Sequence, residues 1–66
     1  MKNRIKEFRA RHDLRQEDLA DKVEVTRQTI LAIETGKYAP SLELAFKIAR
    51  TLKSTVEEVF LYGTQK

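Results

Sequence analysis

The spacing of the apolar residues is the feature that most constrains the fold of this chain. These residues recur every three or four positions, which is the period of an amphipathic helix and not of a strand. Only Gly36, Pro40 and Gly63 interrupt the pattern. The sequence therefore predicts an all-α fold of five short helices, and its 66 residues are enough for one domain over residues 1–66.

The boundaries of the predicted helices follow from capping residues. Thr26 and Ser41 are suitable N-caps, and Thr55 with Glu58 fits the T-x-x-E capping box. Gly36 supplies a left-handed C-terminal stop. The expected helices span about residues 3–12, 16–23, 27–35, 42–52 and 56–60. Residues 61–66 fit either a last helical turn or a short extended tail.

The composition excludes several classes of protein. The chain has no cysteine for disulfides or thiolate metal sites, and no apolar run approaches the ~20 residues of a membrane span. We expect no signal peptide, because the first residues alternate between charged and apolar. The sequence shows no glycine-rich phosphate loop and no catalytic or metal-binding constellation, and its one histidine, His12, fits a helix end. We therefore expect a cytoplasmic protein that is not an enzyme, binds no cofactor or metal and has no evident small-molecule effector.

The segment from Gln16 to Thr35 has the pattern of two short helices joined by a tight turn. Its inward positions are small or apolar, as a close helix crossing requires: Ala20, Val25, Ile30 and Ile33. Two short helices joined by a turn occur in many folds. A net charge of +3 by itself fits the surface of an ordinary soluble protein. The outward face of the second helix is more specific.

That outward face lacks acidic residues, whereas the other exposed helix faces carry Lys and Glu. It consists of Thr26, Arg27, Gln28, Thr29, Leu31, Ala32 and Thr35. Gln can form two hydrogen bonds with adenine, Arg can do so with guanine, and short apolar groups can contact the thymine methyl. The segment therefore predicts a helix that reads base edges in DNA.

Residues 3–60 resemble the Cro/cI-type (XRE-like) phage-repressor helix-turn-helix family. The matching stretch is LRQEDLADKVEVTRQTILAIETGKYAPSLELAFKIARTL followed by STVEEVF, and it is most specific from Gln16 to Leu52. The segments RQTI and KYAPSL also occur in short stand-alone members such as the cytolysin-operon repressor. The resemblance implies a five-helix lambda-repressor-like fold and a homodimeric transcriptional repressor. It further implies that the helix at residues 27–35 reads a palindromic operator in double-stranded DNA from the major groove.

The resemblance also implies roles for individual residues. Contacts to bases are expected from Thr26, Arg27, Gln28, Thr29, Leu31 and Ala32, with Arg27 and Gln28 the main readers. Contacts to phosphates are expected from Gln16, Lys37, Tyr38 and Ser41. Phosphate contacts set position and most of the affinity, whereas base contacts set sequence choice.

Three positions depart from the family pattern. Glu24 stands in the turn where many members have glycine, so it is expected at positive φ with a cost of roughly 1 kcal/mol. Arg15 stands where Ser or Thr often caps the helix, which loses a cap and adds an expected phosphate contact. Ala39 replaces a frequent Asn in the following loop.

Two opposite charges occupy inward positions of predicted helices. Arg9 follows Ile5 by four residues, and Glu34 follows Ile30 by four residues. This placement predicts a partly buried Arg9–Glu34 ion pair, and the family resemblance agrees. A role for Glu34 as a general acid or base is disfavoured, because no second carboxylate, nucleophile or metal ligand accompanies it.

The end of the chain is unusually apolar for so small a protein. We expect a two-fold dimer interface over about residues 55–64, with contacts from Val56, Val59, Phe60, Leu61 and Tyr62. A chain of this size without cysteine also gains from oligomerisation. The alternative function is an antitoxin-like or adaptor module whose main partner is a protein. A nonspecific nucleoid protein is disfavoured by the modest charge and the Gln/Thr-rich face.

Overall fold

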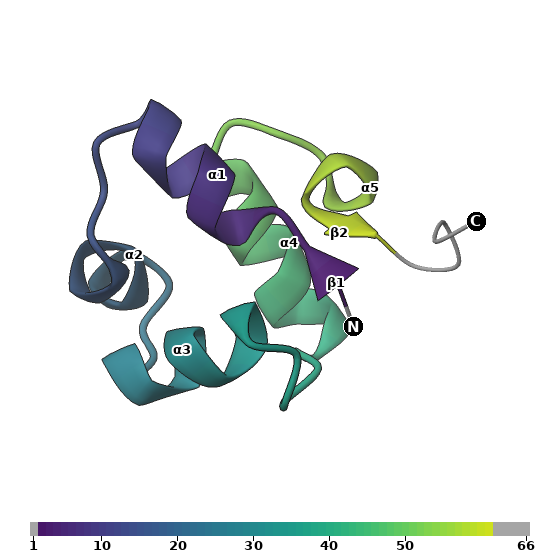
Figure 1. The fold of residues 1–66 in the computed structure, drawn as a ribbon, viewed down its shortest axis with the longest axis horizontal. Coiled ribbons are helices and arrows are strands. Elements are labelled where there is room, and N and C mark those ends of the chain that lie inside the picture. The colour runs from purple at the N-terminus through teal and green to yellow at the C-terminus, as the bar shows by residue number, and fades with distance from the viewer. Residues whose placement is uncertain (1, 62–66) are drawn as a thin grey trace.

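The computed structural model describes residues 2–61, which form five helices and a two-stranded antiparallel sheet (Figure 1). The helices are α1 (Ile5–Arg11), α2 (Gln16–Lys22), α3 (Arg27–Glu34), α4 (Leu42–Thr51) and α5 (Val56–Val59). The strands are β1 (Lys2–Asn3) and β2 (Phe60–Leu61). The mostly helical fold of five helices confirms the predicted fold class, to which the structure adds a small sheet.

The helices begin at capping residues that can be recognised in the sequence. The Thr26 and Ser41 side chains accept hydrogen bonds from Thr29 N and Leu44 N, so both are N-caps as predicted. The Thr55–Glu58 capping box is also present: Thr55 N donates to Glu58 Oε1 at 3.1 Å, and Glu58 N donates to Thr55 Oγ1 at 3.1 Å. These caps satisfy N–H groups that the first helical turn leaves without an intrahelical partner.

The two ends of the described chain differ from the prediction because they pair with each other. Lys2 lies opposite Leu61, and Asn3 lies opposite Phe60, in the β1–β2 sheet. Asn3 was expected in the first helix, but it is extended, and its Oδ1 accepts from Ile5 N at 3.2 Å, where α1 begins. Phe60 likewise leaves the helix and begins β2. Leu61 is therefore extended, while the predictions for residues 62–66 lie outside the described residues.

A single apolar cluster fills the space between the helices. Its buried members come from every helix and from β2: Ile5, Phe8, Leu19, Ala20, Val23, Ile30, Ile33, Ala45, Ile48, Ala49, Leu52, Val59 and Phe60. Leu14, Val25, Leu44 and Val56 are partly buried against it. No helix within residues 2–61 is long and apolar enough to cross a membrane.

Val59 and Phe60 belong to this core, although the sequence placed them in a dimer interface. Their exposed fractions are 0% and 6%. The helix α5 has only four residues and packs its inward side against the core, and pairing with β1 holds Phe60 beside it. Neither side chain is available to a second copy of the chain.

Helix ends in this chain repeatedly use the left-handed backbone region. Gly36 has a φ of 80°, as expected for the stop after α3. Asp13, Glu24 and Lys53 adopt φ values of 58°, 64° and 56° without being glycine. Glu24 therefore has the strained backbone predicted from its replacement of a turn glycine. Its carboxylate lies 3.6 Å from Lys47 Nζ on α4, so its charge is directed toward that helix.

Replacement of Glu24 by glycine should stabilise the protein. We expect Glu24→Gly to raise the free energy of unfolding by about 0.5–1 kcal/mol, because glycine adopts positive φ without steric cost but loses more entropy on folding. Urea denaturation of both proteins measures the difference. The control Lys47→Ala removes the exposed ion pair without changing the backbone and should have little effect. A Glu24→Gly protein less stable than its parent would contradict the assignment of strain.

Candidate nucleic-acid interface

Helix α3 presents one face to the core and the opposite face to solvent. Ile30 and Ile33 are buried, whereas Arg27, Gln28 and Leu31 are exposed. Within residues 2–61, the Arg27 and Gln28 side chains have no hydrogen-bond or ion-pair partner. Both therefore keep their full hydrogen-bonding capacity for a ligand.

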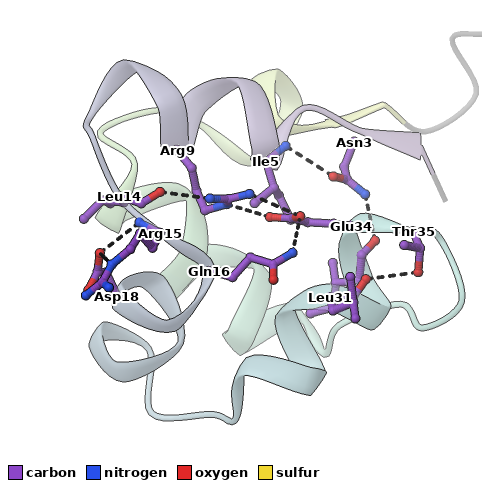
Figure 2. Close-up of polar contacts among 11 residues, drawn as sticks. Asn3, Ile5, Arg9, Leu14, Arg15, Gln16, Asp18, Leu31, Glu34 and Thr35 are labelled. Carbon is purple, nitrogen blue, oxygen red and sulfur yellow. Dashed lines mark hydrogen bonds and ion pairs between the residues drawn. The ribbon is translucent and has the colours of Figure 1, made fainter.

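The hydroxyl groups along α3 are already engaged. Thr26 Oγ1 accepts from Thr29 N at 3.2 Å and lies 3.0 Å from Thr29 Oγ1. At the other end of the helix, the Thr35 hydroxyl donates to the carbonyls of Leu31 and Ala32 (Figure 2 shows the Leu31 bond). The hydroxyls of these threonines are therefore engaged at the two ends of α3.

The start of α2 carries two of the predicted phosphate contacts. Arg15 is well exposed and forms ion pairs with Asp18 and Glu17, each with an N–O distance of 3.2 Å (Figure 2 shows the Asp18 pair). Arg15 supplies no side-chain cap, as predicted, but Asp18 Oδ2 accepts from Arg15 N at 2.9 Å. The Arg15 side-chain hydrogen bond, followed by its backbone hydrogen bond, lowers the pKa of Asp18. The first turn of α2 thus keeps its acceptor ionised at neutral pH.

The loop after α3 carries the other predicted phosphate contacts. The backbone N–H groups of Lys37 and Tyr38 both donate to the carbonyl of Ala32, at 2.9 and 3.2 Å. This places the exposed Lys37 and Tyr38 beside the end of α3. Ser41 is exposed at the start of α4, where its Oγ accepts from Leu44 N at 3.1 Å. The loop is therefore ordered by backbone bonds that leave the Lys37 and Tyr38 side chains available.

The Arg9–Glu34 ion pair predicted from the sequence is present. Arg9 Nε donates to Glu34 Oε2 at 2.7 Å, and the two side chains are only 13% and 8% exposed. Arg9 Nη1 also donates to the carbonyl of Leu14 at 2.9 Å. The pair therefore connects α1 with the last turn of α3 and with the loop that leads into α2 (Figure 2).

The sequence did not reveal two further partners of α3. Gln16 Nε2 donates to Glu34 Oε1 at 3.0 Å, so a residue expected only to bind phosphate also joins the ion pair. Asn3 Nδ2 donates to the carbonyl of Ile33 at 2.8 Å, which connects β1 to the end of α3 (Figure 2). These bonds join residues 18 and 30 positions apart, and no local pattern indicates them.

The fold and the exposed face of α3 together define a helix-turn-helix DNA-binding protein. No group of three or more His, Cys, Asp or Glu side chains within the described part of the chain could hold a metal ion. The comparisons with known proteins agree with this class: a helix-turn-helix family model matches residues 5–59.

Three known proteins illustrate the similarity. The uncharacterized HTH-type transcriptional regulator MJ0272 of Methanocaldococcus jannaschii is 60% identical over 62 residues, which cover 94% of each chain. The cryptic phage CTXphi transcriptional repressor RstR of Vibrio cholerae is 38% identical over 48 residues, which cover 73% of this chain and 43% of RstR. The crystal structure of the clp gene regulator ClgR from Corynebacterium glutamicum matches with a TM-score of 0.75 and 25% identity. That match covers 79% of this chain and 55% of the ClgR chain.

The chain belongs to the Cro/cI-type helix-turn-helix family. It is a DNA-binding transcriptional regulator and not an enzyme. The Cro/cI-type family predicted from the Gln16–Leu52 stretch is confirmed. The closer resemblance to short stand-alone members, predicted from the RQTI and KYAPSL segments, stays a prediction.

Loss of Arg9 should be strongly destabilising. We expect Arg9→Ala to lower the free energy of unfolding by about 3–5 kcal/mol, because Glu34 would remain buried without its charged partner. Replacing both residues with apolar ones, Arg9→Met with Glu34→Leu, should recover much of that loss. Chemical denaturation measures both effects.

The exposed Arg4–Glu7 pair provides the matched control for this experiment, with an N–O distance of 2.8 Å. Arg4→Ala should change stability only slightly, because water screens the pair. An Arg9→Ala protein with the same unfolding midpoint as its parent would overturn the role assigned to the pair.

Proposed function

We propose that residues 1–66 act as one DNA-binding domain of a homodimeric repressor that binds a palindromic operator in the cytoplasm. Each copy would place α3 in the major groove, with the two recognition helices about 34 Å apart. The observation that carries the proposal is the solvent face of α3. It has no acidic side chain, and its Arg27 and Gln28 are exposed and without a partner among residues 2–61.

Sequence choice would rest on the first half of α3. Arg27 can form two hydrogen bonds with guanine, and Gln28 can form two with adenine. Leu31, with Ala32 and the methyl groups of Thr26 and Thr29, would supply apolar contacts to thymine methyls. The engaged threonine hydroxyls would hold the start of the helix in one orientation.

Affinity and register would rest on residues around α3. Arg15 and Gln16 at the start of α2, with Lys37, Tyr38 and Ser41 after α3, would contact phosphates. Gln16 can serve both DNA and scaffold, because one N–H of its amide donates to Glu34 and a second donor remains. A phosphate bound there would therefore be held by a side chain that the Arg9–Glu34 pair orients.

Repression is supported by a relative and by the mode of binding. RstR, which is similar to this chain over 48 residues, is a phage transcriptional repressor. A dimer seated across a palindrome covers two adjacent turns of the duplex. Such a complex can exclude other proteins from a promoter without a further activity.

Selection of binding sites from random duplex DNA by the purified protein tests the proposal. We expect a palindromic consensus with half-sites one helical turn apart. Selection of no consensus, together with stoichiometric co-purification of another protein, would instead favour an adaptor module.

Substitutions should separate base contacts from phosphate contacts. Arg27→Ala is expected to cost about 1–3 kcal/mol on the consensus and to relax specificity at one base pair in each half-site. Lys37→Ala should weaken binding to all sequences alike and reduce the slope of log affinity against log salt by about 1 per subunit. Fluorescence anisotropy at several salt concentrations measures both, with Lys6→Ala on the exposed side of α1 as the control. Equal losses on specific and random DNA for Arg27→Ala would contradict its assignment to base readout.

A further inference from the structure

Two large apolar side chains on α4 are exposed without a role in the fold. Among the described residues, the exposed large hydrophobics are Leu31 (44%), Tyr38 (50%), Leu42 (72%) and Phe46 (50%). Leu31 and Tyr38 lie in the proposed DNA surface. Leu42 and Phe46 do not, and they stand one helical turn apart, so they form one stripe on α4.

The stripe faces away from the helix-turn-helix. Lys47 on α4 reaches Glu24 in the turn between α2 and α3, so that side of α4 faces the turn. Around the axis of α4, Phe46 and Lys47 lie on opposite sides of the buried face of the helix, which is formed by Ala45, Ile48 and Ala49. In Figure 1, α2 and α5 lie on opposite sides of α4, and both contact it. The stripe is therefore on the flank of α4 that continues toward α5.

We propose that Leu42 and Phe46 form the centre of the homodimer interface, with a second copy of this chain as the occupant. This inference rests on the proposed function, which requires a two-fold dimer. In a two-fold interface both subunits present the same patch, so Leu42 and Phe46 would pack against their counterparts and the α5 flank.

The area that a dimer needs supports this location. A standard interface buries about 800 Å² per partner, whereas the whole chain exposes 4689 Å². The described residues of the C-terminal segment offer little exposed apolar surface to such an interface. Val59 and Phe60 are buried in the core, and Val56 and Leu61 are already partly buried. Extending the interface across α4 adds its two most exposed large apolar side chains.

The charges around the stripe match a second copy better than DNA. Glu43 and Arg50 flank it on α4, and Glu57 lies on the adjoining α5; all three are exposed. None of them forms an ion pair within residues 2–61. DNA carries only negative charge, so it would not pair with the acidic side chains of this rim. In a two-fold interface, the acidic side chains of each copy can pair with the basic side chains of the other. The polar rim around an apolar centre is also the usual anatomy of an interface.

Charge placed on the stripe should therefore separate the subunits. We expect Phe46→Glu and Leu42→Glu, each in the full chain, to raise the dimer dissociation constant about thirtyfold or more. Sedimentation equilibrium over a range of protein concentrations measures it. Both side chains are at least half exposed, so the fold should persist, which circular dichroism and cooperative unfolding will show. Phe46→Ala gives a milder second variant that should weaken the dimer in the same direction.

The control is Leu31→Glu, which makes the same kind of change on α3. It should abolish operator binding while leaving the dimer dissociation constant unchanged. A folded Phe46→Glu protein that dimerises like its parent would overturn the inference but leave the proposed function standing. A parent protein that is monomeric both free and on its selected operator would also overturn it. Failure of the parent to bind any selected DNA would defeat the proposed function instead, and the sedimentation result would still decide the interface.

Discussion

The ion pair between Arg9 and Glu34 is the contact on which the arrangement of the helices depends. Three short helices meet at it, because Glu34 lies on α3, Arg9 on α1 and the third partner, Gln16, at the start of α2. Arg9 also holds the carbonyl of Leu14 in the intervening loop. Helices of seven or eight residues have little stability of their own in water. Their mutual angles must therefore come from side-chain contacts, and this network supplies directional ones.

Apolar packing holds α3 in place together with the ion pair. Ile30 and Ile33 lie on the inward side of α3, so the helix is held by the core along its length and by Glu34 at its end. A buried charge is costly when unpaired, so the network tolerates only arrangements that keep all its partners together. The outward position of Arg27 and Gln28 follows from this fixed rotation of α3. The contacts that α3 makes with the core and the ion pair therefore set the direction of its outward side chains.

Local features of the sequence were sufficient to predict much of the structure. The caps Thr26, Ser41 and Thr55 and the stop at Gly36 act within one helical turn, so their residues are readable in order along the chain. The Arg9–Glu34 pair was also predictable, because each charge interrupts an apolar stripe of helical period. The positive φ of Glu24 followed from its replacement of a turn glycine.

The features that were not predicted depend on residues distant in sequence. Asn3 and Phe60 pair in a sheet whose strands are two residues long, too short to show an alternating pattern. The same pairing buries Phe60. Because the pairing is not visible in the sequence, the apolar end of the chain was predicted to be a surface for a second copy. Gln16 occupies a surface position of α2 by spacing alone, and only the position of Glu34 in space reveals their hydrogen bond.

The division of α3 into two faces has a consequence for how such regulators diverge. The inward side chains of Ile33 and Glu34, which hold the helix, are distinct from the exposed side chains of Arg27 and Gln28, which we propose read DNA. Duplicated genes encoding this scaffold can therefore exchange the outward side chains and acquire new target promoters while the folding contacts stay intact. The same separation makes the domain a suitable framework for building sets of mutually orthogonal genetic switches.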